Sequence, residues 1–197
     1  MIESGLDFSF AQGFVVNKFD DLPFYRERFS KLPHGKGVDF LAVSKDCIIL
    51  VEVKNCQGDE RNNRWRIFPN NSKLMTTNTA TDTSHRSSLD IEVSEKVAMT
   101  LACLTGAYTQ CENAESAAFS KRFWDSITRR PLPAIKIILF LEGNFGTPSR
   151  SKEMIMHSLT MSIKNKLSWL ACQVIVEDSA TCKRKYYSAS EIKVTAK

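Results

Sequence analysis

The sequence of 197 residues has no apolar run near the length of about 20 residues that crosses a bilayer. Its first residues, 1–7, include two acidic side chains and no basic stretch, so we expect no secretory signal. These absences favour a cytoplasmic protein with no membrane partner. With 43% hydrophobic and 25% charged residues, we expect residues 1–197 to form a single domain that buries its own core.

Several familiar chemistries are also missing. The six cysteines form no C-x-x-C pair, and the three histidines do not have zinc-finger spacing, so we expect no thiolate metal site. The sequence contains no internal repeat, no glycine-rich loop that could hold a phosphate and no Ser-His-Asp spacing. A net charge of +5 is compatible with a polyanionic partner but does not require one.

What the sequence does contain is a pair of neighbouring apolar segments that carry three charges. Residues 38–43 and 47–53 are rich in apolar and β-branched side chains, and the polar turn between them predicts a hairpin. Asp39 interrupts the first segment, and Glu52 and Lys54 interrupt and follow the second. Because side chains alternate across a strand, we expect Glu52 and Lys54 on the same face.

Two carboxylates and one ammonium converge if Asp39 faces the same way as Glu52 and Lys54. Bringing like charges together away from water costs free energy unless a cation relieves the repulsion, so this cluster favours a hard divalent metal ion. The simpler alternative is that Glu52 and Lys54 form an ordinary ion pair on a solvent-facing strand. The acidic residue inside the preceding apolar strand weighs against that alternative.

At these residues the sequence resembles the PD-(D/E)xK nuclease superfamily, which has the restriction-endonuclease-like fold. Gly37-Val38-Asp39 corresponds to the first half of the motif and Glu52-Val53-Lys54 to the second, although Val38 replaces the proline that names it. The resemblance covers about 20 residues directly and, through the order of elements, roughly two thirds of the chain. It implies an α/β fold with a restriction-endonuclease-like core, a central mixed β-sheet flanked by helices.

The resemblance also implies a role for each residue of the motif. Asp39 and Glu52 would be ligands of Mg²⁺ (or Mn²⁺), together with the backbone carbonyl of Val53. Lys54 would position the attacking water or help to deprotonate it, and would offset the developing negative charge.

Two predicted helices carry further candidates. On a helix expected over about residues 22–32, Glu27 is a candidate metal ligand, since family members often have an acidic residue there; a solvated glutamate is the alternative. Apolar residues at helical spacing predict a buried helix over residues 87–106. The resemblance makes Lys96 or Glu92 on this helix a candidate site residue, whereas their i,i+4 spacing favours a surface ion pair.

Other segments predict the rest of such a core. Further helices are expected over residues 112–130 and 149–170. The continuous apolar run 134–142 is typical of a central strand buried on both faces, and a final strand is expected over 172–177 with a parallel crossover between the two. Residues 65–68 alternate like a short edge strand.

Scattered basic residues are candidate contacts for the phosphates of a nucleic acid. They are Lys36 in the loop before the first charged segment, Arg64 and Arg66 beside a tryptophan, and Lys96. The basic run 183–185 lies next to two tyrosines and could form a phosphate-binding patch, although a solvated basic segment is the commoner case.

The function that follows is that of a metal-dependent nuclease that hydrolyses phosphodiester bonds through a metal-activated water at Asp39, Glu52 and Lys54, with DNA favoured over RNA as the substrate. Small nucleases of this kind occur in restriction, repair, mobile-element and phage-defence settings, and those that cut both strands often pair as homodimers. The alternative is a catalytically inactive nuclease-fold protein that serves as a nucleic-acid-binding or assembly subunit. The intact set of three residues favours the enzyme.

Overall fold

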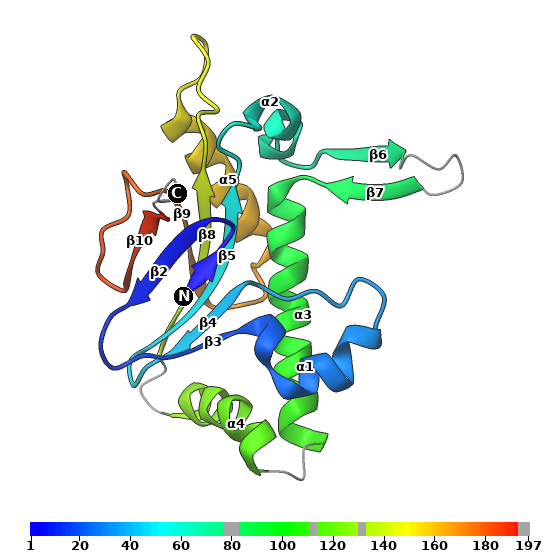
Figure 1. Ribbon diagram of the computed structural model, residues 1–197, viewed down its shortest axis with the longest axis vertical. Helices are drawn as coiled ribbons and strands as arrows, with labels where there is room; N and C mark the ends of the chain where they lie inside the picture. The colour runs from blue at the N-terminus through cyan, green and yellow to red at the C-terminus, as the bar shows by residue number, and fades with distance from the viewer. Residues whose placement is uncertain (77–82, 111–113, 130–132, 193–197) are drawn as a thin grey trace, which may run out of the picture.

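The computed structural model describes residues 1–76, 83–110, 114–129 and 133–192 (Figure 1). Within these ranges, five strands form a central sheet in the order β3-β4-β5-β8-β9. Strand β4 is antiparallel to both of its neighbours, β3 and β5. Strands β5, β8 and β9 run parallel to one another. The protein therefore has an α/β fold with a mixed sheet, as expected. The strands are β3 (Val15–Lys18), β4 (Phe40–Val43), β5 (Cys47–Asn55), β8 (Ala134–Glu142) and β9 (Cys172–Glu177).

The predicted hairpin is confirmed as strands β4 and β5. Ser44 closes the turn, because its N–H donates to the carbonyl of Cys47 (2.9 Å) and its hydroxyl accepts a hydrogen bond from the N–H of Cys47 (3.1 Å). Phe40 then pairs with Val51 at the other end of the ladder. Asp39 immediately precedes β4, so this register places it beside the second half of β5.

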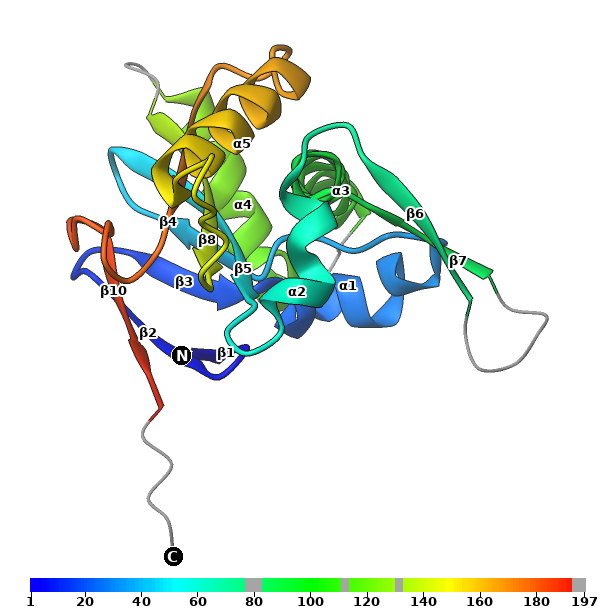
Figure 2. The same cartoon turned by 90° about the horizontal axis from the view of Figure 1, so that it is seen from above.

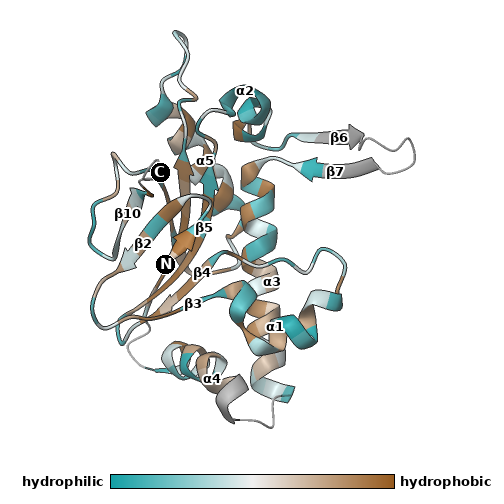
Figure 3. Ribbon diagram, in the orientation of Figure 1, coloured by the Kyte–Doolittle hydropathy of each residue, from teal (hydrophilic) through white to brown (hydrophobic). Residues whose placement is uncertain are grey.

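Helices cover one face of the central sheet, and Figure 3 shows β5 and β8 as largely hydrophobic strands beneath them. Leu50 and Leu139 form one apolar cluster with Val97 and Leu159 of the covering helices. Glu52 continues the alternation of Leu50 and therefore faces the helices too. Within the described ranges, none of the helices has the length and apolar character needed to span a membrane. The covering helices are α3 (Leu89–Gln110), α4 (Ala114–Thr128) and α5 (Lys152–Lys166).

A small sheet in the order β1-β2-β10 covers the other face. Aromatic rings fill the interface, where the ring centre of Phe8 lies 5.1 Å from those of Phe40 and Phe140. The terminal segments of the chain thus close the second core. The strand over 172–177 is not the last one, since β10 follows it. The strands are β1 (Ile2–Glu3), β2 (Leu6–Phe10) and β10 (Tyr187–Glu191).

The three later predicted helices and the crossover are confirmed, with different ends where the structure describes them. Helix α3 does not stop at Gly106 but continues to Gln110. The glycine at position 106 makes room for a neighbour, since a Cβ there would lie 2.9 Å from the ring of Phe24. Helix α5 is shorter than the predicted segment, and for α4 the predicted residues 112, 113 and 130 lie outside the described residues. Strands β8 and β9 are parallel neighbours joined through α5, as a crossover requires.

Two local predictions are wrong. Residues 65–68 are not an edge strand, since residues 64–67 form a 3-10 helix in which the adjacent side chains of Arg66 and Ile67 are both buried. The helix expected over 22–32 divides in two, because Arg28 leaves the helical conformation (φ −127°, ψ −58°). The elements of these segments are η1 (Phe19–Asp21), α1 (Pro23–Glu27), η2 (Phe29–Lys31), α2 (Glu60–Asn63) and η3 (Arg64–Ile67).

A two-stranded hairpin projects from the body next to the start of α3 (Figure 1 and Figure 2). It consists of β6 (Ser72–Thr76) and β7 (Thr83–Ser87), which pair in antiparallel register from Ser72 opposite Ser87. The sequence predicts no element in this region. The hairpin leads directly into α3, so it forms one wall of the space in front of that helix.

Candidate functional site

The three motif residues predicted from the sequence lie together at one end of the central sheet. Lys54 and Glu52 project from the same face of β5, with the Lys54 Nζ 2.6 Å from Oε1 of Glu52. Asp39 reaches the same strand from β4, since the N–H of Val53 donates to its Oδ2 at 2.7 Å. The prediction that Glu52 and Lys54 share a face is confirmed.

Burial excludes the simpler interpretation of an exposed ion pair. The Glu52 side chain is completely inaccessible (0% exposed), and that of Lys54 is 18% exposed. Oxygen Oε1 of Glu52 pairs with two ammonium groups, whereas its Oε2 is buried and has no hydrogen-bond partner. An unsatisfied buried acceptor costs about 1 to 3 kcal/mol, and more when it is charged. The site therefore contains a carboxylate oxygen that is short of a positive partner.

Helix α3 supplies the second ammonium and a third carboxylate. The Lys96 Nζ lies 2.6 Å from Oε1 of Glu52, and Oε1 of Glu92 lies 2.8 Å from the Lys54 Nζ. The interpretation of Glu92 and Lys96 as a surface ion pair is therefore wrong, because each of them pairs with β5. The result is a chain of alternating charges between the strand and the helix.

The same face of α3 also holds the segment before Asp39. The N–H of Val38 donates to the hydroxyl of Thr100 (3.0 Å), which in turn donates to the carbonyl of Lys96 (2.7 Å). Glu92, Lys96 and Thr100 are spaced at i, i+4 and i+8, so they form a polar stripe along the helix. That stripe is the sequence signal that identifies all three residues.

The pKa values reflect this arrangement. Burial, followed by the neighbouring Glu52 carboxylate, raises the pKa of Asp39 to about 6. Burial alone would lower the pKa of Lys54, but the Glu52 and Glu92 carboxylates outweigh it and raise that pKa. Burial would raise the pKa of Glu92, but Lys54 and Arg66 lower it to about 2. Lys54 is thus an ammonium at neutral pH, and Asp39 is the carboxyl group that feels the like-charge repulsion.

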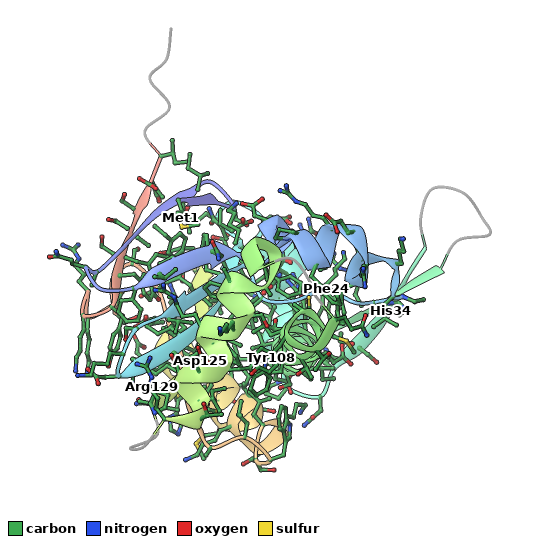
Figure 4. All side chains as sticks on the ribbon, turned by 90° about the horizontal axis from the view of Figure 1, so that it is seen from below. Met1, Phe24, His34, Tyr108, Asp125 and Arg129 are labelled. Carbon is green, nitrogen blue, oxygen red and sulfur yellow. The ribbon has the colours of Figure 1, made fainter. Side chains whose placement is uncertain are left out.

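A cavity of about 550 Å³ leads to this cluster along α3. Lys96 and Glu92 line its inner wall, so the cavity reaches two side chains that contact Glu52 and Lys54. Figure 4 places His34, another lining residue, beside the β6–β7 hairpin. Most of the charged groups on the outer walls are basic: Lys31, Lys36 and Arg86.

The remaining predicted site residues lie in different environments. Lys36 is exposed and lines the cavity, and Arg64 is exposed on η3. Arg66 is only 5% exposed and pairs with Glu92, so it holds the cluster in place instead of contributing to a phosphate-binding surface. Glu27 is exposed at the end of α1, and among the described residues it makes no contact with the cluster.

Comparison with known proteins gives one match. Residues 22–190 match the model of a family described as a family of unknown function (DUF6661). The chain belongs to this family. The match includes Asp39, Glu52, Lys54 and Lys96, so the whole charged cluster lies inside the segment that defines the family. No curated protein and no solved structure matches the chain.

The DUF6661 chain offers only a small acidic ligand set. Within the described residues, no group of three or more His, Cys, Asp and Glu side chains is close enough to hold a metal ion. The carboxylates near one another at the end of the sheet are Asp39 and Glu52, with the backbone of Val53 beside them. Two carboxylates are compatible with magnesium, which keeps several of its waters when it binds to proteins.

Proposed function

We propose that the protein is a metal-dependent nuclease with a restriction-endonuclease-like core, and that it hydrolyses phosphodiester bonds, with DNA as the favoured substrate. The observation that carries the proposal is the buried carboxylate pair of Asp39 and Glu52. Burial, and then repulsion by Glu52, raises the pKa of Asp39, and one oxygen of Glu52 has no hydrogen-bond partner among the described residues. A divalent cation would relieve the repulsion and satisfy that oxygen.

The residues present fit Mg²⁺ or Mn²⁺. Asp39 and Glu52 would hold the ion through hard oxygen atoms, and the backbone carbonyl of Val53 is the proposed third ligand. When bound, such an ion supplies a nucleophilic water near neutral pH and neutralises negative charge on the phosphate. The unpartnered Oε2 of Glu52 supports this assignment, since the oxygen is buried within the cluster and not used by any described residue.

The chain's own residues would orient and stabilise the reacting groups. Lys54 is held as an ammonium by Glu52 and Glu92, so it suits the donation of a hydrogen bond to the attacking water or to a phosphate oxygen better than the removal of a proton. The second ammonium, from Lys96, fixes the orientation of the Glu52 carboxylate. The basic walls of the cavity, including Lys36, would attract the phosphate backbone.

Cleavage assays with purified protein test the proposal. Single-stranded, duplex and branched DNA and RNA would be incubated with Mg²⁺, with Mn²⁺ or with a chelator. We expect metal-dependent cleavage that Lys54→Ala reduces by about 100-fold or more while the melting temperature shows that the variant is folded. Lys164→Ala, at an exposed position on α5, is the matched control and should cleave normally. If the Asp39→Ala and Glu52→Ala variants both cleave as the wild type does, the assignment of the site is wrong.

A second candidate is a nuclease-fold subunit that binds nucleic acid without cutting it. The observation in its favour is that Lys54 and Lys96 already neutralise one oxygen of Glu52 without any metal. Retained binding of a labelled oligonucleotide, with no cleavage in either metal, would support this alternative. A cytoplasmic location and a homodimer stay predictions under both functions.

A further inference from the structure

A second basic cavity lies on the face of the sheet opposite the charged cluster. On β8, Ile137 and Leu139 pack against the helices, whereas Lys136 alternates with them and points to the side of the small sheet. The cavity there has a volume of about 360 Å³, within the range of small-ligand sites. The residues that line it include Lys136, Gln173, Lys183, Arg184, Lys185 and Tyr186.

Lys136 is a buried ammonium without a carboxylate partner. The residue is only 9% exposed, its Nζ donates to Oε1 of Gln173, and it lies 5.2 Å from the centre of the Tyr186 ring. Among the described residues, no acidic side chain forms an ion pair with it. Because burial of an uncompensated charge is unfavourable, this position is suited to an anion that is not part of the chain.

Lys185 brings a second ammonium to the same ring. Its Nζ lies 5.4 Å from the centre of Tyr186, and it too is in no ion pair among the described residues. Lys183 and Arg184 add two more cations to the rim, so four cationic side chains meet one lining carboxylate. An aromatic ring contributes only about 0.5 to 2 kcal/mol per cation and cannot neutralise the group.

The one acidic residue that lines the cavity, Glu177, forms no ion pair with any of these cations. Oxygen Oε1 of Glu177 accepts a hydrogen bond of 2.5 Å from the hydroxyl of Tyr187. The basic loop is fixed at its start, where the N–H and the hydroxyl of Thr181 donate to the carboxylate of Asp178 (2.8 and 2.7 Å). The cations are therefore presented by an anchored loop and a sheet strand, and two of them lie over the ring of Tyr186.

We propose that this cavity binds a phosphate ester, either a free nucleotide or a phosphodiester of a nucleic acid. A phosphate group offers several anionic oxygens to the ammonium groups of Lys136 and Lys185 at once. Since the cavity is on the other face of the sheet, its occupant does not fill the cavity that leads to Asp39 and Glu52. The inference does not depend on nuclease activity.

The test measures binding in a chelator, so that no cleavage intervenes. Two probes separate the two sources of phosphate: ATP by titration calorimetry, and a short fluorescent single-stranded DNA by anisotropy. We expect wild-type protein to bind at least one probe, and Lys136→Gln and Lys185→Gln each to weaken that binding by about tenfold. If the two variants bind only ATP more weakly, the cavity is a nucleotide site. If they bind the DNA more weakly, it is a nucleic-acid site.

Two controls keep the outcome decisive. Lys164→Gln, at an exposed position on α5 outside the cavity, should bind both probes as the wild type does. Lys185 is exposed on the rim, so Lys185→Gln still reports if Lys136→Gln fails to fold. The proposal is overturned if neither probe binds, or if the Lys185 and Lys164 variants have equal affinities for both probes. Neither result bears on cleavage at the charged cluster.

Discussion

The two faces of the central sheet bury charge in different ways. On the helix side, Glu52 shares one oxygen between Lys54 and Lys96, and its other oxygen lacks a partner. On the side of the small sheet, Lys136 is buried against an aromatic ring, and no described carboxylate forms an ion pair with it. On the first face a buried carboxylate oxygen lacks a hydrogen-bond partner, and on the second a buried ammonium lacks an ion-pair partner, among the described residues. We propose a cation for the first face and a phosphate ester for the second.

The helix side should depend on its charges for stability, and Glu52→Ala tests this most severely. Removal of the shared carboxylate leaves the ammonium group of Lys96 without its ion-pair partner, and leaves Lys54 with Glu92 alone. We expect the free energy of unfolding to fall by about 3 to 5 kcal/mol, measured by urea denaturation. Glu95→Ala, at an exposed position on the same helix, is the control and should change it by no more than about 0.5 kcal/mol. A loss below about 1 kcal/mol for Glu52→Ala would mean that the cluster is not a stabilising network.

The pH dependence of stability should separate Asp39 from the paired charges. Its folded pKa is about 6, above the ordinary value of 3.8, so the folded protein binds this proton more tightly than the unfolded chain does. The stability linked to Asp39 is therefore complete below about pH 4 and is lost as the pH rises through 6, by up to about 3 kcal/mol. Asp39→Asn removes this titrating group. The free energies of unfolding of the wild type and the variant, measured by urea denaturation, should therefore converge or cross between pH 4.5 and 7.

Added Mg²⁺ sharpens the same measurement. A metal ion binds the deprotonated carboxylate, so it should stabilise the wild type more at pH 7 than at pH 5. Asp39→Asn should show little stabilisation at either pH. Equal stabilisation of wild type and variant by Mg²⁺ would contradict the assignment of Asp39 as a ligand.

A smaller effect is expected where α3 holds the segment before Asp39. Thr100 and Thr105 both donate to the carbonyl four residues earlier, but only Thr100 also accepts a hydrogen bond, from the N–H of Val38. Thr100→Val should cost about 1 to 3 kcal/mol because it leaves that buried N–H without a partner. Thr105→Val is the matched control, and its loss should stay within about 0.5 kcal/mol. Similar losses for the two variants would show that the contact with Val38 is not important for holding the strand.

Local periodicity predicted most of the framework. The hairpin of β4 and β5, the helix α3 and the buried strand β8 follow from alternation or helical spacing, which depend on neighbours in sequence. Alternation also placed Glu52 and Lys54 on one face. These predictions succeeded because each needs only the conformation of one segment.

The failures come from contacts between segments. The alternation of Arg66 with apolar neighbours predicted a strand. Arg66 instead lies in a 3-10 helix and pairs with Glu92, which is far from it in sequence. Glu92 and Lys96 fit a surface pair by spacing, but the packing of α3 on the sheet turns both toward β5. The burial of Lys136 likewise depends on the loop before β10, which the sequence of β8 alone does not predict.

The smallest effect on stability is expected on the side of the small sheet. Lys136 has no carboxylate to lose, so Lys136→Gln should change the free energy of unfolding by less than about 1 kcal/mol, and removal of the unpaired charge could stabilise the protein. Lys152→Gln provides the contrast, because Lys152 pairs with Asp178, which is 6% exposed, and its loss leaves a buried carboxylate without that cation. Urea denaturation of both variants measures which of them loses more free energy of unfolding. If Lys136→Gln loses more than Lys152→Gln, the ammonium of Lys136 stabilises the small-sheet core and is not a binding group for an anion.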